Sequence, residues 1–391
     1  MAFDWLDTAL DHKKQDGYLR TRAVVEYEKD GIICINGAHY LNFASNDYLG
    51  MRHDEGVLQT WVEGLAQFGG GSGASPLVTG YTQAHQALEA YLAEHLNREA
   101  VLLFNSGFAA NQTVCQALFG QHNSGDGLIV ADKYMHASFV DGALACNATL
   151  RRFRHNDMQH AEQLLAKHHE TDCLIASEGV FSMDGDSAPL DELIALSQAH
   201  NSWLMLDDAH GFGVLGTRAM GSAEHYQLTQ QQVPLVMGTF GKAVGTAGAF
   251  VAGSQALIDY LVNEARHYIY STAMPPAQAL ATLYALQHIP GSGRQQQLQD
   301  NIAAFRQCAE QAGLALSDSA SAIQPVLIGD PAQTLALAEA LKARGIWVGA
   351  IRYPTVPKAT DRLRITLSNS HTRRDIEALV DALALAREAV T

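Results

Sequence analysis

Polar side chains follow four short apolar runs of the sequence, at points where buried strands would end. The runs 101–104, 174–176, 203–206 and 235–237 lead into NSGFAAN, SEGVFSMDGD, DDAHGFG and GTFGKA. Because ligands of parallel α/β sheets bind beyond the carboxyl ends of the strands, we expect these segments to meet in one site. Together they bring a helix-opening glycine turn, a serine and a glutamate, an aspartate and a histidine, and a lysine.

This set of side chains fits the needs of one cofactor, pyridoxal 5′-phosphate (PLP). Its aldehyde reacts with a lysine amine, its pyridine nitrogen pairs with a carboxylate, and its phosphate binds at a helix N-terminus. Lys242 is the candidate lysine, because it stands in GTFGKA at the end of a strand, and Asp207 is the candidate carboxylate. Gly107 and Phe108 turn a strand into a helix and are the candidate phosphate contacts.

Two histidines are candidates for contacts with the cofactor ring. His210 lies three residues beyond Asp207, within reach of the ring hydroxyl, and His136 in KYMHASF is placed to stack on the ring. For His136 an ordinary buried histidine is an equal interpretation. Asp207, Asp208 and His210 also have the chemistry of metal ligands. The glycines that follow them disfavour the continuous helix that a shared ligand face needs, so we prefer the cofactor interpretation.

Three glycine motifs allow other interpretations. The segment 211–216 matches GxGxxG, but no apolar-faced helix follows it and no acid stands about 20 residues on, so a glycine-rich turn is favoured over a NAD site. A P-loop is disfavoured because Ala243 follows Lys242 where a serine or threonine is required. The glycines of 69–73 have no adjoining lysine, and we interpret them as a loop near the substrate.

The elements that must position these residues alternate between strand and helix. Further apolar runs indicate strands, and residues spaced three or four apart indicate helices. This alternation predicts an α/β fold with a largely parallel sheet that is buried on both faces. The additional expected strands are 128–130 and 249–252, and the expected helices are 83–97, 158–168 and 190–200.

The chain divides into three parts by its patterning. We expect an N-terminal arm at 1–44, a large domain at 45–288 and a small C-terminal α/β domain at 289–391, which begins near the GSGRQQQ stretch. Within these parts we expect a hairpin with Asn36 and Gly37 at its turn, a helix after Pro275 and Pro276, strands at 346–351 and 363–367, and a C-terminal helix with the stripe Ile376, Leu379, Val380 and Leu383.

Composition limits the function classes. With 47% hydrophobic and 17% charged residues the 391-residue chain is typical of a globular protein, and its net charge of −15 disfavours nucleic acid or an anionic membrane as partner. The five cysteines are scattered without a CxxC pair, which indicates reduced thiols. Without a signal-peptide pattern or an apolar run of about 18 residues, we expect a soluble cytoplasmic protein.

Five motifs, in order along the chain, resemble those of the α-oxoamine synthases. They are SNDYLG, SGFAAN, EGVFSMDGD, DDAHGFGVLG and TFGK. The resemblance implies PLP-dependent transferase fold type I, as in aspartate aminotransferase, with a large domain and a smaller C-terminal α/β domain. It also implies decarboxylative joining of an amino acid to an acyl thioester. Two further stretches, HYIYSTAMPPAQ and IRYPTVPKATDRLRITLSNSH, are most similar to the biotin-pathway branch, which implies L-alanine and a pimeloyl thioester of coenzyme A (CoA) or acyl carrier protein.

The resemblance also implies roles for individual residues. Lys242 would hold the cofactor and then act as the base, and Asp207 would pair with the pyridinium. The other implied cofactor contacts are His136, His210 and Ser182 at the ring, Thr239, Gly107 and Phe108 at the phosphate, and Ser271 and Thr272 reaching the phosphate from the neighbouring subunit of a homodimer. The implied substrate contacts are Arg20, Asn46, His136, Arg352 and Thr355, with Tyr353 standing where this branch would have a proline.

Three alternatives remain open from the sequence. Within the family, a synthase that condenses glycine with acetyl-CoA is the alternative. Outside it, a NAD-binding oxidoreductase would use the GxGxxG segment. A PLP-binding protein without catalytic activity is the third alternative.

Overall fold

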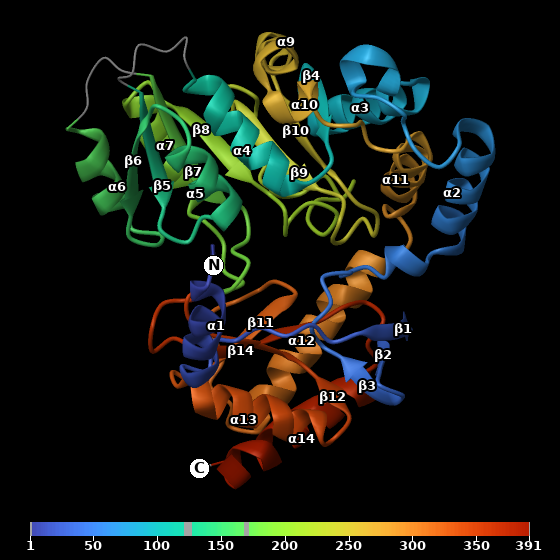
Figure 1. The fold of residues 1–391 in the computed structure, drawn as a ribbon, viewed down its shortest axis with the longest axis vertical. Coiled ribbons are helices and arrows are strands. Elements are labelled where there is room, and N and C mark those ends of the chain that lie inside the picture. The colour runs from blue at the N-terminus through green and yellow to red at the C-terminus, as the bar shows by residue number, and fades with distance from the viewer. Residues whose placement is uncertain (1, 121–126, 168–171, 391) are drawn as a thin grey trace. The chain divides into compact units, whose positions relative to one another are not determined.

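The computed structural model describes residues 2–120, 127–167 and 172–390, and its contacts divide the chain into two compact units (Figure 1). Unit 1 comprises Met1–Tyr48, Met183–Asp186 and Gln296–Thr391, and unit 2 comprises Leu49–Ser182 and Ser187–Gln295. Each unit is described by itself. The division into an arm, a large domain and a small domain stays a prediction.

A seven-stranded sheet forms the centre of unit 2, in the order β4-β10-β9-β8-β7-β5-β6. The neighbours from β6 to β9 pair in parallel, and β10 pairs antiparallel with both β9 and β4. All of these strands except β10 therefore end at the same edge, which we call the carboxyl edge. The strands are β4 (Ala100–Phe104), β5 (Leu128–Asp132), β6 (Thr149–Phe153), β7 (Cys173–Glu178), β8 (Trp203–Asp207), β9 (Leu235–Thr239) and β10 (Ala249–Gly253).

Helices bury the central strands of this sheet, as the continuous apolar runs predicted. Every residue of β5 and β10 is buried. Val114 of α4 (Gly107–Leu118), Phe139 of α5 (Ala137–Leu144) and Leu261 of α9 (Gln255–Glu264) have no exposed surface and belong to one apolar cluster with strand residues. The predicted α/β fold is confirmed.

The other helices of unit 2 lie around this sheet (Figure 1). α2 (Glu55–Phe68) packs closely on α11 (Pro276–His288), because a Cβ at Gly64 would lie only 2.7 Å from the Cα of Ala277. The remaining short or peripheral helices are η1 (Met51–His53), η2 (Pro76–Gly80), α3 (Gln83–Leu96), α6 (Met158–Leu165), α7 (Leu190–Ala199), α8 (Ser222–His225) and α10 (Arg266–Ile269).

Unit 1 contains two small sheets. The first has the order β1-β2-β3-β12, and the second has the order β11-β14-β13. The predicted hairpin is present, with Asn36 and Gly37 both at positive φ in its turn. The elements of unit 1 are α1 (Trp5–Gln15), β1 (Val25–Lys29), β2 (Ile32–Ile35), β3 (Ala38–Asn42), α12 (Arg294–Gln311, with its first two residues in unit 2), β11 (Ile323–Leu327), α13 (Pro331–Lys342), β12 (Ile346–Trp347), β13 (Gly349–Ile351), β14 (Arg362–Thr366) and α14 (Arg373–Val390).

The predicted strand at 346–351 is wrong as a single element. Ile346 and Trp347 pair in parallel with β3, whereas Gly349 to Ile351 pair antiparallel with β14 in the other sheet. An apolar run shows that a segment is buried, but it does not say which strand the segment pairs with.

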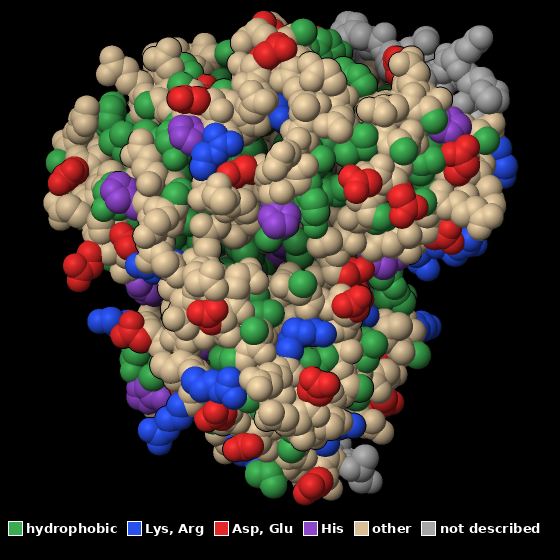
Figure 2. Space-filling model, turned by 180° about the vertical axis from the view of Figure 1, so that it is seen from behind, with side chains coloured by type: hydrophobic (Ala, Val, Ile, Leu, Met, Phe, Trp, Pro, Cys, Tyr) green, Lys and Arg blue, Asp and Glu red, His purple; other side chains and the backbone are tan. Residues whose placement is uncertain are grey.

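The surface agrees with the charge count. On the face drawn in Figure 2, acidic side chains are interspersed with lysines and arginines, as expected from 41 acidic and 26 basic residues. Within the described residues, no helix has the length and apolar character needed to cross a membrane.

Candidate active site

Two buried carboxyl groups lie side by side at the carboxyl edge of unit 2. Glu178 ends β7 and Asp207 ends β8, and the two are direct register partners, so their side chains project from the same face of the sheet. Each is only 3% exposed. Asp207 Oδ2 accepts a hydrogen bond from Asn111 Nδ2 at 2.8 Å, and Oδ1 accepts one from the backbone N–H of Ala209 at 3.1 Å.

Burial favours the neutral form of Glu178. It raises the pKa of Glu178 well above its usual value, and the charge of Asp207 raises it further. Lys242 and hydrogen bonds from the backbone of His136 and Ser182 oppose this shift. Glu178 therefore joins the backbones of two predicted cofactor residues, next to the predicted pyridinium partner.

Lys242 lies in the connection between β9 and β10, against His210. Its Nζ is 2.7 Å from His210 Nε2. The connection is closed at its base by Thr239, whose hydroxyl donates to the carbonyl of Gly248 at 2.8 Å. The charge of Lys242 also acts on the buried carboxyls of Glu178 and Asp208. The structure thus brings the predicted lysine, its histidine neighbour and the strand-end carboxyls together.

His136 caps the N-terminus of α5 and is linked to Asp207 by hydrogen bonds. Asn111 Nδ2 donates to Ser138 Oγ at 3.0 Å, and Ser138 Oγ lies 2.8 Å from His136 Nδ1. Although the ring keeps solvent contact, loss of hydration lowers the pKa of His136, Asp207 opposes this, and Lys242 lowers it further. The lowered pKa therefore favours the neutral ring of His136, whose Nδ1 accepts hydrogen bonds.

The N-terminus of α4 offers unused backbone donors. Ser106 Oγ accepts from the N–H of Ala109 at 3.2 Å, and the Ser106 carbonyl accepts from the N–H of Ala110 at 3.1 Å. Among the described contacts, the N–H groups of Gly107 and Phe108 make no hydrogen bond. A Cβ at Gly107 would meet no atom nearer than 3.8 Å, so the backbone is not crowded at this residue. This is the arrangement that binds a phosphate.

These donors and acceptors fit PLP. A lysine is present for the aldehyde, a buried carboxylate for the pyridine nitrogen, a neutral histidine for the ring face and a helix N-terminus for the phosphate. All of them belong to unit 2. Ser182, predicted at the ring, is half-buried and also lies in this unit, where its backbone contacts Glu178.

Asp208, next to Asp207, has a structural role in the same loop. Its two oxygens accept hydrogen bonds from the N–H and the hydroxyl of Ser222, each at 2.6 Å. Burial raises the pKa of Asp208 to about 7. The segment 208–222 consists mostly of turns folded around this carboxyl, so its interpretation as a glycine-rich turn is confirmed.

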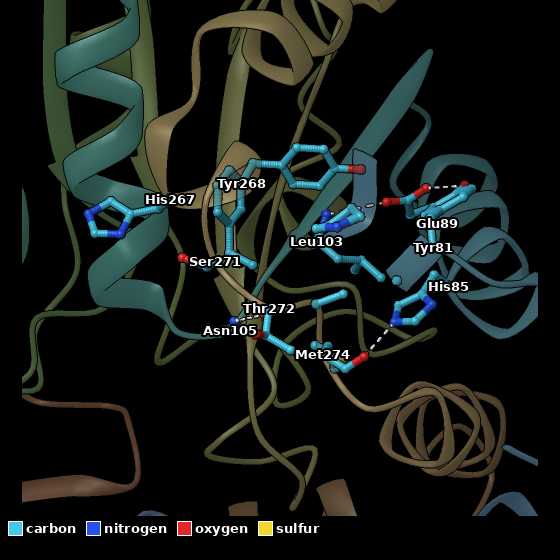
Figure 3. A pocket seen from close by; sticks show the side chains of 14 residues that line it. Tyr81, His85, Glu89, Leu103, Asn105, His267, Tyr268, Ser271, Thr272 and Met274 are labelled. Atoms are coloured by element: carbon cyan, nitrogen blue, oxygen red, sulfur yellow. Dashed lines mark hydrogen bonds between the residues drawn. The ribbon is translucent and has the colours of Figure 1, made fainter. Parts of the chain in front are cut away.

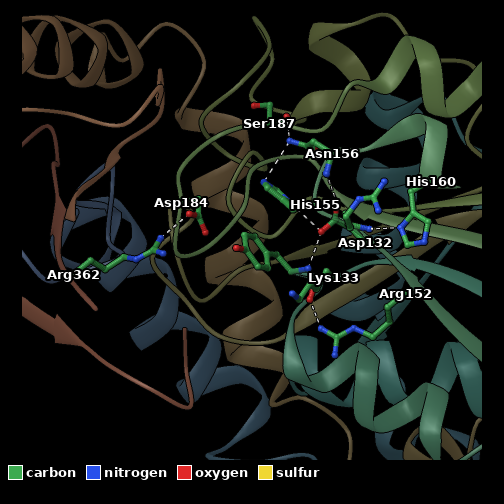
Figure 4. A network of polar contacts seen from close by, with 11 residues as sticks. Asp132, Lys133, Arg152, His155, Asn156, His160, Asp184, Ser187 and Arg362 are labelled. Atoms are coloured by element: carbon green, nitrogen blue, oxygen red, sulfur yellow. Dashed lines mark hydrogen bonds and ion pairs between the residues drawn. The ribbon is translucent and has the colours of Figure 1, made fainter. Parts of the chain in front are cut away.

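Asp132, at the end of β5, belongs to a separate network of polar contacts (Figure 4). Its Oδ1 lies 3.0 Å from His155 Nδ1, and its Oδ2 accepts from the N–H of Asn156 at 2.9 Å. His155 packs edge-on against Phe181, with ring centroids 4.5 Å apart. Asp132 thus supports the residue that precedes Ser182 in the chain.

Ser271 and Thr272 follow α10 and lie beside a small pocket in unit 2. Within the described residues, no hydrogen bond connects either side chain to Lys242 or to the N-terminus of α4. Asn105 Nδ2 donates to the backbone carbonyl of Thr272.

Four of the predicted substrate residues, Arg20, Asn46, Arg352 and Thr355, belong to unit 1, whereas the fifth, His136, belongs to unit 2. Arg20 Nη2 donates to Thr355 Oγ1 at 3.2 Å, and Arg352 donates to the carbonyl of Gly17. Arg20, Arg352 and Thr355 line one hollow. Asn46 lies elsewhere in the unit, where its Oδ1 accepts from both terminal nitrogens of Arg364 at 3.1 Å.

Comparison with known proteins identifies the family. The aminotransferase class I and II family matches residues 38–383. The chain belongs to this family. Among curated members, it is 46% identical to 8-amino-7-oxononanoate synthases of Cellvibrio japonicus and Aeromonas hydrophila, over 97% of this chain and 94% of each relative. The predicted resemblance to the α-oxoamine synthases is confirmed.

Solved structures agree with this assignment of the family. Serine palmitoyltransferase of Sphingomonas wittichii superposes with a TM-score of 0.92 at 30% identity, covering 99% of this chain and 98% of that one. A serine palmitoyltransferase from S. paucimobilis that carries a bound adduct of PLP and myriocin gives 0.91 at 28% identity, with the same coverage. The 8-amino-7-oxononanoate synthase of Francisella tularensis gives 0.77 at 30% identity, covering 90% and 98% of the chains.

Three side chains of the site received no role from the sequence. Glu178 was noted only as a glutamate at a strand end, and Asn111 and Ser138 were not singled out, yet all three connect the predicted residues. The sequence did point to Glu178, because it stands directly at a strand end in SEGVFSMDGD. For Asn111 and Ser138 the sequence gives no such signal, since only the packing of α4 against α5 brings the two side chains together.

Proposed function

We propose that this chain is an 8-amino-7-oxononanoate synthase that condenses L-alanine with a pimeloyl thioester and releases carbon dioxide. The 46% identity to synthases of this name over nearly the whole chain carries the proposal. The grouping of Lys242, His210 and Asp207 supports it, because these are the side chains that a PLP-dependent condensation needs.

PLP, when bound, supplies an electron-accepting ring that stabilises negative charge at the α-carbon of the amino acid. Lys242 Nζ would hold the cofactor covalently and, once alanine has taken its place, would act as the base for the α-proton. His210 Nε2, 2.7 Å away, accepts a hydrogen bond from Nζ and directs it. Asp207 pairs with the protonated pyridine nitrogen, and Asn111 and Ala209 hold its carboxylate in place.

The other site residues bind and orient. The N–H groups of Gly107 and Phe108 bind the phosphate together with Thr239, and Ser182 contacts the ring oxygen. His136 would cover the face of the cofactor ring and would be placed to contact the thioester carbonyl. Arg352 binds a substrate carboxylate, for which the planar guanidinium is suited, and Arg20, Asn46 and Thr355 make further substrate contacts.

A homodimer completes the proposal. Leu58, Val62 and Leu65 recur at helical spacing on α2 and are 46%, 59% and 43% exposed. An exposed apolar stripe of this kind marks an interaction surface, and a second copy of the chain is the partner that we infer. In this dimer, Ser271 and Thr272 bind the phosphate of the cofactor held by the other subunit. A cytoplasmic location stays a prediction.

The experiment that tests the function is a titration of the PLP-loaded protein with L-alanine and with glycine, followed by visible absorption. We expect the cofactor band to respond selectively to alanine, and mass spectrometry to detect 8-amino-7-oxononanoate when pimeloyl-CoA or pimeloyl-acyl carrier protein is added. A response mainly to glycine, with turnover of acetyl-CoA, would favour the alternative synthase. Absence of any band in the presence of PLP would contradict both.

A further inference from the structure

Side chains hold three consecutive backbone carbonyls, those of residues 272–274. Figure 3 shows the contacts that Asn105 and His85 make with this segment. The carbonyl of Thr272 accepts from Asn105 Nδ2 at 2.7 Å. The Ser72 hydroxyl lies 2.8 Å from the carbonyl of Ala273 and 2.6 Å from that of Met274, a three-centre arrangement. His85 Nε2 lies 2.7 Å from the carbonyl of Met274. We call Ser72, His85 and Asn105 the carbonyl clamp.

Each member of the carbonyl clamp comes from a different part of unit 2. Ser72 lies in the glycine-rich loop 69–73, His85 lies in the first turn of α3, and Asn105 directly follows β4. Within the same segment, the N–H of Ala273 donates to the carbonyl of Ala74 at 2.9 Å. The backbone of residues 272–274, directly after Ser271, is therefore held by groups from several parts of unit 2.

His85 is fixed in the state that the carbonyl clamp needs. The backbone N–H of Thr82 donates to His85 Nδ1 at 3.1 Å, so the hydrogen of the neutral ring is on Nε2, facing the carbonyl of Met274. His85 is buried, and burial lowers its pKa, which favours this neutral form.

The helix that carries His85 is itself tied to the edge of the sheet. One turn further along α3, Glu89 Oε1 accepts from the N–H of Leu103 in the edge strand β4 at 3.3 Å. Glu89 Oε2 accepts from the hydroxyl of Tyr81 at 2.7 Å (Figure 3). These bonds fix the position of α3 against β4, and with it the position of His85.

The side chains at the start of this segment, and of the residue before it, are partly or largely exposed. Tyr270 is 72% exposed, Thr272 is exposed and Ser271 is half-buried. Hydroxyl donors on a rigid backbone lose little conformational freedom when they bind an anion, so pre-arrangement of the backbone increases affinity. This combination is suited to the phosphate contact given to Ser271 and Thr272 above.

We propose that Ser72, His85 and Asn105 are positioning residues that hold Ser271 and Thr272 in place for the phosphate of the cofactor bound by the partner subunit. The proposal rests on the proposed PLP-dependent function and on the homodimer. It gives the glycine-rich loop 69–73 a role on the cofactor side of the site through Ser72, whereas the sequence indicated a loop near the substrate.

The first test compares the affinity of the apoenzyme for PLP and for pyridoxal, which lacks the phosphate. We expect Ser72→Ala to weaken PLP about tenfold, while pyridoxal changes less than about twofold. Ser72→Thr keeps the hydroxyl and is the matched control, with expected affinities near those of the wild type. Asn105→Asp, which turns the donor into an acceptor against the carbonyl of Thr272, should act as Ser72→Ala does.

Two outcomes of this comparison would overturn the proposal. Equal weakening of PLP and pyridoxal would mean that the carbonyl clamp supports the fold of the whole site rather than the phosphate contact. Unchanged PLP affinity in both Ser72→Ala and Asn105→Asp would mean that it has no role in binding. Failure of the proposed function is a separate result, since the wild type itself would then not bind PLP.

The second test asks whether the carbonyl clamp acts across the dimer. Consider a hybrid dimer of one Ser72→Ala chain and one Lys242→Ala chain. Of the two, only the Ser72→Ala chain keeps Lys242 and can bind PLP covalently. If the contact crosses subunits, the other chain supplies that site with an intact clamp. Borohydride-trapped PLP on Lys242 should then show wild-type affinity, whereas an affinity as weak as that of the Ser72→Ala homodimer would overturn the arrangement.

Discussion

Lys242 lies near two carboxyl groups whose pKa is raised by burial and near a histidine whose pKa is lowered. Burial and nearby carboxylates favour the neutral forms of Glu178 and Asp208, and His136 favours a neutral ring. Asp207 is held by hydrogen bonds from Asn111 and from a backbone N–H. At the scale of single residues, the site therefore carries less negative charge than its count of carboxyl groups indicates, so the attraction of a protonated ring nitrogen falls to Asp207 in the proposed function.

Replacing Lys242 with alanine is expected to lower kcat at least about 10³-fold, because both the covalent attachment and the base are lost. Steady-state kinetics and mapping of the borohydride-reduced cofactor to a peptide measure the two losses. Lys167→Ala, at an exposed lysine of the same unit, is the control and should change neither. A Lys242→Ala variant with more than a tenth of wild-type activity would contradict the assignment.

Asp208→Asn is expected to make thermal stability less dependent on pH. The native pKa of Asp208 is about 7, against about 3.9 in the unfolded chain. The stability that comes with the bound proton is thus complete below about pH 3.9 and is lost as the pH rises toward 7. Asparagine cannot ionise and can still bond both groups of Ser222, so the melting temperature of the variant relative to wild type should be several degrees higher at pH 8 than at pH 5.

Calorimetry of the apoenzyme at the two pH values measures this difference. Asp191→Asn replaces an exposed aspartate of α7 and should follow the wild type at both pH values. If Asp208→Asn shows no larger pH effect than Asp191→Asn, the buried carboxyl is not the source of the dependence.

At the scale of elements, a substitution at the N-terminus of α4 can change cofactor binding without changing the stability of the helix. Gly107 is the first residue of the helix, where proline is well tolerated, and Ser106 before it is extended, as a residue preceding proline must be. Gly107→Pro should therefore keep the helix and remove one N–H group. We expect the affinity for PLP to fall about tenfold and that for pyridoxal to stay within about twofold.

Gly107→Ala is the matched variant for this measurement. It keeps the N–H group, and its Cβ would meet no atom of the apoenzyme nearer than 3.8 Å. Fluorescence titration of both variants with PLP and pyridoxal, with circular dichroism to follow helix content, distinguishes them. If proline and alanine weaken PLP equally, the N–H group of Gly107 does not bind the phosphate.

Apolar runs were sufficient to predict most of the large sheet but not its exceptions. The runs of β4, β5, β7, β8, β9 and β10 were found because these strands are buried on both faces. β6 was missed, since it is an edge strand of sequence TLRRF with exposed arginines. The antiparallel direction of β10 also leaves no mark in the sequence. The residues at strand ends were found for the same reason as the strands, whereas Asn111 and Ser138 depend on how two helices pack.

At the scale of the whole molecule, the exposed apolar residues Leu58, Val62 and Leu65 of α2 are the expected contact between the subunits of the homodimer. Val62→Arg would place a charge in the proposed contact between subunits, where a buried unpaired charge is strongly unfavourable. We expect light scattering to find a monomer, and activity to fall with the loss of the partner's phosphate contact. Leu144→Arg, at a 69% exposed leucine outside the stripe, should remain dimeric. A dimeric and active Val62→Arg variant would place the interface elsewhere.

The pairing of β3 with β12 has a consequence for biosynthesis. Leu41 and Asn42 leave the ribosome early, but their register partners Ile346 and Trp347 are made about 300 residues later. At roughly 5–20 residues per second, this is a delay of tens of seconds. During that time the edge of β3 that later pairs with β12 has no strand beside it, so the nascent chain depends on chaperones to avoid pairing with other chains.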